Sequence, residues 1–147
     1  MSRTGNLRSM LSDPTLLVEQ AYIGGVWCDS DNGQNFEVLN PSTSEVIATI
    51  PDMGIVETKR AIDVAYTAQK SWVKKTGKER AAVLKEFHNN LIKNADDLAI
   101  ILTAEMGKPL SEAKGEILYG ASFIEWFSEE AKRVYGETIP GHQPDKR

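Results

Sequence analysis

The stretch from Leu110 to about Tyr135 constrains the fold more than any other part of this chain, because it is apolar around much of a helix. Helical spacing gives it two adjacent stripes, one of Leu110, Ala113, Ile117, Ala121, Ile124, Phe127 and Ala131, and one of Tyr119, Phe123 and Trp126. A helix with so wide an apolar arc is covered on more than one side. We therefore expect it to lie against several other elements.

The first third of the chain has the turn signals that are typical of a β meander. In Y-I-G-G-V-W, residues 22–27, two glycines supply the positive φ angles of a two-residue hairpin turn. A second turn signal follows at 31–33. The pattern then predicts strands at 36–39 and 46–50, joined by a turn at 40–43 and stopped by Pro51.

After Gly54 the hydrophobic period becomes helical. Thr76 and Glu79 have the spacing of a capping box, and Gly107 is well placed as a left-handed residue after a helix end. Pro109 suits the first turn of the helix that follows. The pattern predicts four helices, at about 56–72, 76–94, 95–106 and 110–135.

Composition excludes several classes of function. The 147 residues have the length of one ordinary domain, with 41% hydrophobic and 26% charged residues and no long apolar run, so we expect neither disorder nor a membrane span. The net charge of -4, with 17 basic among 21 acidic side chains, argues against a nucleic-acid partner. A single cysteine cannot form an internal disulfide, which favours the cytoplasm.

The residue types that carry chemistry have plain structural readings here. Cys28 lies beside Asp29 in a hairpin, and neither His88 nor His142 has metal-ligand spacing around it, so all three are read as structural or surface residues. Lys108 follows a glycine as in a phosphate loop, but the next residue is a proline, which donates no amide. Most glutamates of the last helix are interleaved with basic residues and form a solvated face.

Four quoted stretches together resemble the N-terminal part of an aldehyde dehydrogenase: Y-I-G-G-V-W (22–27), L-N-P-S-T-S-E-V-I (39–47), E-M-G-K-P (105–109) and A-K-G-E-I-L-Y-G-A-S-F-I-E-W-F-S-E-E (113–130). The last of these, with Y-G-E-T-I-P-G-H-Q (135–143), is most similar to the succinate-semialdehyde dehydrogenase branch. The resemblance runs in order from about Gln20 to the end.

This resemblance implies an α/β fold of which the chain is the N-terminal portion, with β hairpins followed by about four helices. Residues 1–20 would be an N-terminal tail, 21–135 part of the nucleotide-binding domain, and 136–147 the start of the crossing into an oligomerisation flap. The complete enzyme would be a homo-oligomer that oxidises a small aldehyde, through a cysteine thiohemiacetal and hydride transfer to NAD or NADP.

The sequence lacks the family motifs that carry this chemistry, namely the Asn in W-N-F-P, the Lys in K-P, the G-x-T-x-x-G turn, the Glu in E-L-G-G-K and the Cys in G-Q-x-C. We therefore expect no turnover and no bound cofactor for this chain alone. The resemblance places Glu116, Gly120 and Phe123 on the wall of the substrate tunnel. It also places the Leu39 carbonyl and Glu105 at a structural monovalent cation.

A different class of function remains open from the sequence. The stripe of Tyr119, Phe123 and Trp126 could dock the last helix on a partner, which would make the chain a non-enzymatic helical interaction module. A fragment that lacks its sheet would instead self-associate. A defined stoichiometric partner would favour the module.

Overall fold

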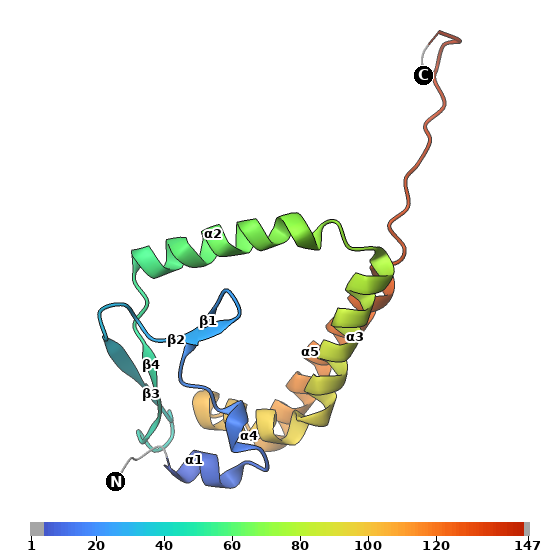
Figure 1. Cartoon of the computed structure of the whole chain (residues 1–147). Helices are drawn as coiled ribbons and strands as arrows, with labels where there is room; N and C mark the ends of the chain where they lie inside the picture. The colour runs from blue at the N-terminus through green and yellow to red at the C-terminus, as the bar shows by residue number, and fades with distance from the viewer. Residues whose placement is uncertain (1–4, 146–147) are drawn as a thin grey trace.

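The computed structural model describes residues 5–145, in which antiparallel strand pairs precede four long helices. Figure 1 shows these elements around an open frame, with the C-terminal segment leading away from it. The predicted order of β hairpins followed by about four helices is confirmed. The elements are α1 (Gly5–Met10), the 3-10 helix η1 (Pro14–Leu16), β1 (Ala21–Ile23), β2 (Val26–Cys28), β3 (Asn35–Leu39), β4 (Val46–Pro51), α2 (Ile55–Trp72), α3 (Gly77–Lys93), α4 (Ala95–Met106) and α5 (Leu110–Glu130).

The strands form two separate antiparallel pairs, β1 with β2 and β3 with β4. Gly24 and Gly25 join the first pair with φ angles of 64° and 85°, which confirms the predicted two-residue turn. In the second pair the register shifts between Val38 and Leu39. The extra residue is Ile47, so the bulge lies on β4, opposite the end of β3.

The helix boundaries follow the predicted caps, except at the C-terminal end of α5. The Thr76 hydroxyl accepts the amide of Glu79, whose carboxylate accepts the Thr76 amide in return, and Gly107 has the left-handed φ of 75°. The last helix ends at Glu130 rather than near Tyr135. Val134 and Tyr135 are about four-fifths exposed, so no packing offsets their weak helix propensity.

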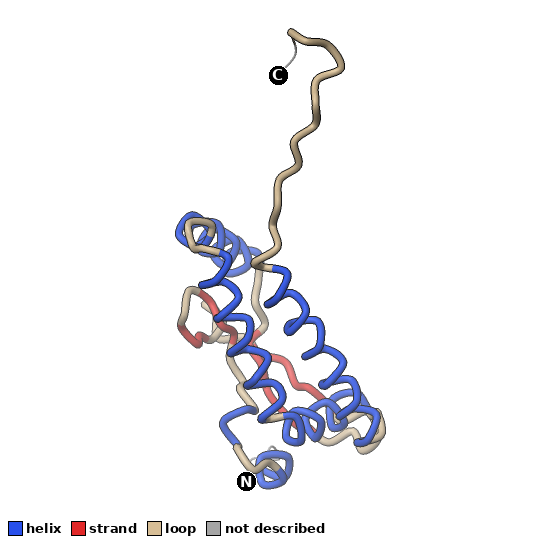
Figure 2. The backbone as a smooth tube through the Cα atoms, turned by 90° about the vertical axis from the view of Figure 1, so that its right-hand side faces the viewer, coloured by secondary structure: helices blue, strands red, loops and turns tan. Residues whose placement is uncertain are grey.

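Helix α5 packs along α3 in the opposite direction and also lies against α4 (Figures 1 and 2). Its buried positions are small, at Ala113, Ala121 and Ser128, which lets the helices approach closely. At the far end of the pair, Gly77 of α3 lies against the backbone of Ala131. Helix α2 spans another side of the frame (Figure 1).

The segment predicted to be an N-terminal tail, residues 1–20, supplies three of the four residues of the buried hydrophobic cluster. Leu7, Leu11 and Leu17 are each at least nine-tenths buried, together with Ile47 of β4. Partly buried side chains of β3 and α4 surround them. Residues 1–4 lie outside the described residues. Leucines one helical turn apart, at 7 and 11, were the signal in the sequence that this segment packs.

Candidate functional site

Glu116, Gly120 and Phe123 lie along one stripe of α5, as their spacing of four and three residues requires. The Glu116 carboxylate is paired with the Lys108 ammonium group, from the turn before the helix. Within the described residues, nothing lies within 4 Å of the position that a Cβ would take on Gly120. The stripe is therefore open, and its role as a tunnel wall stays a prediction.

The aromatic side chains near the C-terminal end of this stripe are also exposed to solvent. Phe123 is 47% and Trp126 63% exposed, and the Phe123 ring meets Tyr119 edge-on, with ring centroids 4.9 Å apart. Phe123, Trp126 and Phe127 line an open groove, together with Ser122, Glu125 and Glu129. Helix α5 is thus covered by α3 and α4 on one side, while its aromatic side has no cover among residues 5–145.

Lys108 is the partner of Glu116 that sequence reasoning missed. It was read only as part of the punctuation between two helices. Its ammonium group is brought to Glu116 by the turn that Gly107 and Pro109 make between α4 and α5. A separation of eight residues across a turn has no periodic signal, so only the folded chain reveals the pair.

The two residues of the predicted cation site lie on neighbouring elements. Leu39 ends β3, and Glu105 is exposed on the last turn of α4. The turn after β3 meets the end of α4, since a Cβ on Gly107 would come within 3.2 Å of Pro41. Among the described residues no three His, Cys, Asp or Glu side chains gather as metal ligands would. The cation site stays a prediction.

His88 and Cys28, which the sequence analysis interpreted as structural or surface residues, each contact a backbone carbonyl group. His88 of α3 lies with its Nδ1 3.0 Å from the Ala121 carbonyl oxygen of α5, and its ring is 13% exposed. A carbonyl accepts, so Nδ1 carries the proton. The Cys28 thiol donates to the Ala21 carbonyl across the hairpin at 3.6 Å. His142 lies exposed in the C-terminal segment.

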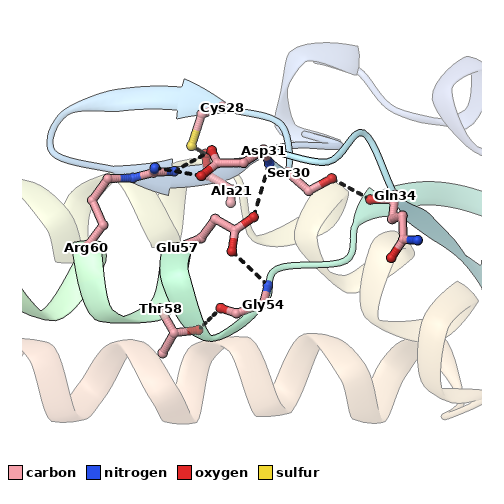
Figure 3. A network of polar contacts seen from close by, with 9 residues as sticks. All are labelled: Ala21, Cys28, Ser30, Asp31, Gln34, Gly54, Glu57, Thr58 and Arg60. Carbon is pink, nitrogen blue, oxygen red and sulfur yellow. Dashed lines mark hydrogen bonds and ion pairs between the residues drawn. The ribbon is translucent and has the colours of Figure 1, made fainter.

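A buried carboxylate joins the first hairpin to α2 (Figure 3). Glu57 is only 4% exposed, and its two oxygens accept the amides of Asp31 and Gly54, each at 3.1 Å. The Arg60 guanidinium donates two hydrogen bonds of 2.9 Å to the Asp31 carboxylate. This interaction lowers the pKa of Asp31. The network holds the loop after β2 on the first turn of the helix.

The first turns of the four long helices do not offer a free site for the pyrophosphate of a dinucleotide. Pyrophosphate binds where a glycine-rich turn aims free amides from a helix N-terminus. Each of the four long helices instead carries a carboxylate in its first turn, namely Glu57, Glu79, Asp96 with Asp97, and Glu112. The amides of Gly54 and Thr76 already donate to such carboxylates. An anion is repelled at these helix ends.

None of the helices that the structure describes is long and apolar enough to cross a lipid bilayer.

Comparison with known proteins identifies the family. A model of the aldehyde dehydrogenase family matches residues 27–147. Glutarate-semialdehyde dehydrogenase of Pseudomonas putida is 60% identical over 137 residues, which are 93% of this chain and 28% of that protein. The NADP-dependent succinate-semialdehyde dehydrogenase of Escherichia coli is 52% identical over the same shares of each chain.

Solved structures agree with the sequence relatives. The crystal structure of succinate-semialdehyde dehydrogenase from Burkholderia pseudomallei matches with a TM-score of 0.88 and 56% identity, and covers 90% of this chain and 28% of that chain. This chain thus spans the N-terminal 28% or so of the curated relatives that it matches. The family predicted from four short motifs is confirmed: this chain belongs to the aldehyde dehydrogenase family.

Proposed function

We propose that this chain is the N-terminal portion of an NAD(P)-dependent aldehyde dehydrogenase whose complete form oxidises succinate semialdehyde to succinate. The observation that carries the proposal is an identity of 52–60% to succinate- and glutarate-semialdehyde dehydrogenases over 93% of the chain. Succinate and glutarate semialdehydes differ by one methylene, so both belong to the proposed class of short aldehydes with a terminal carboxylate. One methylene is worth only about 1–3 kcal/mol of discrimination.

In the complete enzyme this chain would supply scaffold rather than reacting groups. Glu116, Gly120 and Phe123 would form part of the wall beside the aldehyde, and the open space at Gly120 suits the close approach of another chain segment or a ligand. The nicotinamide cofactor would be held outside these 147 residues, since every long helix described here carries a carboxylate in its first turn.

The chain alone is predicted to be inactive. The purified 147-residue protein is mixed with NADP or NAD and with succinate or glutarate semialdehyde, and the absorbance of the reduced cofactor is followed. A full-length relative serves as the positive control. We expect no rise above the rate without protein. A robust rise in absorbance that scales with protein concentration would refute the proposal that all reacting groups lie in other parts of the complete enzyme.

The exposed rings of α5 also support a second candidate, a non-enzymatic module that docks through this helix. Tyr119, Phe123 and Trp126 are 47–65% exposed on one face. A pull-down with the wild-type chain and a Trp126→Ser variant separates the two ideas. One stoichiometric partner, lost in the variant, supports the module. Concentration-dependent self-association without such a partner supports the fragment.

The remaining expectations concern the complete enzyme. A homo-oligomer is proposed, because the C-terminal segment leads away from the frame (Figure 1) and exposes large apolar side chains, with Val134, Tyr135 and Ile139 80–85% exposed. A cytoplasmic location and the absence of a nucleic-acid partner are proposed from the single cysteine and the acidic balance. Fractionation of cells that express the tagged complete protein, followed by sedimentation of the purified enzyme, tests location and assembly.

A further inference from the structure

The segment of residues 5–19 lies between β4 and α4 and fills the space that separates them. Leu7, Leu11 and Leu17 make the buried cluster with Ile47 of β4, and Ile100 and Ile101 of α4 lie against the same cluster. Met10 lines two cavities of about 360 and 460 Å³ at this junction, each of which also has the turn after β3 and residues of α4 in its walls. The strand pair therefore meets the helix largely through this segment.

One carboxylate fastens the segment to α4. Asp97, in the first turn of that helix, accepts the amides of Ser12 and Asp13 at 2.9 and 2.8 Å. The side chain is among the few buried charged groups, with 6% of its residue surface exposed. Two amides converge on one buried carboxylate, an arrangement that fixes the segment in position as well as satisfying its backbone.

A second carboxylate fastens the same segment to β4. Glu19 accepts the amide of Thr49 with one oxygen at 2.9 Å and pairs with Arg8 through the other at 2.7 Å. Arg8 also donates to the Pro14 carbonyl at 3.0 Å, which holds the segment in its compact form. The two anchors thus join α4 to β4 through residues 5–19.

We propose that residues 5–19 form a releasable latch, held by Asp97 and Glu19, that fastens the β3–β4 strand pair on α4. The closed latch covers the apolar sides of Ile47, Ile100 and Ile101. Its opening uncovers them and frees the strand pair, while the α3–α5 helix pair keeps its own contacts. This conformational device acts independently of the proposed catalytic function.

The ionisation of Asp97 and Glu19 makes the stability of the latch depend on pH. Asp97 faces the backbone amides of Ser12 and Asp13 from the latch, while the neighbouring Asp96 is 80% exposed and pairs with Lys114 of α5. Amide donation from Ser12 and Asp13 lowers the pKa of Asp97, and the Arg8 hydrogen bond lowers that of Glu19. Both groups hold the latch when ionised, so the latch weakens as pH falls through their lowered pKa values.

Hydrogen exchange of the full chain, resolved by mass spectrometry, tests the proposal with Asp97→Asn and Asp96→Asn as a matched pair. Asparagine retains one acceptor oxygen but turns an N–H group toward a donor, so one bond is lost. We expect exchange of residues 5–19 and of β4 to rise about tenfold or more in Asp97→Asn, the effect of one hydrogen bond to a charged group. Asp96→Asn should leave it unchanged, because that side chain is 80% exposed.

Two results would overturn the latch. One is equal exchange of residues 5–19 in both variants, and the other is an equal rise in α3 and α5, which would mean general unfolding. If Asp97→Asn does not fold, Arg8→Gln tests the other anchor without touching α4. Loss of the Arg8–Glu19 pair should raise exchange at Thr49 and in residues 5–19, with α5 unchanged. No rise there would equally reject the proposal.

Discussion

A single methyl group at Gly77 tests how closely α3 and α5 pack. Gly77 is the first residue of α3, and a Cβ there would lie 2.5 Å from the backbone oxygen of Ala131, just beyond α5. Ordinary contact begins at 3.4 Å, so the two helix ends must separate by about 0.9 Å in Gly77→Ala. The contacted atoms are backbone, and no side-chain rotation relieves the clash.

The expected loss follows from two opposing effects. Overpacking of this kind destabilises by about 1–3 kcal/mol. Replacing glycine by alanine in a helix contributes up to about 1 kcal/mol in the opposite direction. We therefore expect Gly77→Ala to lower the free energy of unfolding by about 1 kcal/mol.

Gly115→Ala is the matched control, because it makes the same chemical change on the exposed face of α5. Within residues 5–145, nothing lies within 4 Å of its Cβ position. Only the gain in helix propensity remains, so this variant should be more stable by about 0.5–1 kcal/mol. Urea denaturation followed by circular dichroism measures both. A Gly77→Ala protein as stable as Gly115→Ala would refute the close approach of the two helix ends.

Three further changes test other parts of the structure. Thr76→Ala removes the cap of α3 and should lower the free energy of unfolding by about 1 kcal/mol. The control Thr67→Ala, within α2, should leave this free energy unchanged. Equal effects of the two substitutions in urea denaturation would contradict the capping box. Arg8 lowers the pKa of Glu19 from its ordinary value of 4.5, so protection of residues 5–19 from exchange should be full above that pH and be lost as the pH falls through the lowered pKa; protection that increases on acidification would contradict the sign. Trp126→Ser should weaken self-association in sedimentation velocity, and an unchanged sedimentation profile would exclude this face of α5 from it.

Local chemistry made most element boundaries predictable. The capping box at Thr76 and the left-handed residue Gly107 act within one helical turn, so their sequence neighbours suffice to identify them. The end of α5 was placed about five residues too far along, because spacing alone does not reveal that Val134 and Tyr135 have little to pack against. Propensity decides where packing is missing.

The candidate site divides in the same way. The alignment of Glu116, Gly120 and Phe123 along one stripe follows from helical periodicity. Their surroundings do not, since the Lys108 partner of Glu116 depends on the path of the turn between α4 and α5. The approach of Pro41, in the turn after β3, to Gly107 at the end of α4 likewise depends on contacts between segments that are far apart in the chain.

The family, the antiparallel hairpins, the four long helices and the residues that share a face of α5 could be predicted from the sequence, because motifs, caps, turns and periodicity are local properties. The position of residues 5–19 between β4 and α4 could not be predicted and follows from long-range contacts. Asp97 lies more than eighty residues from the amides that it accepts, and no local pattern marks a carboxylate for burial. Which side of α5 is covered was decided in the same way, by the helices that fold back on it.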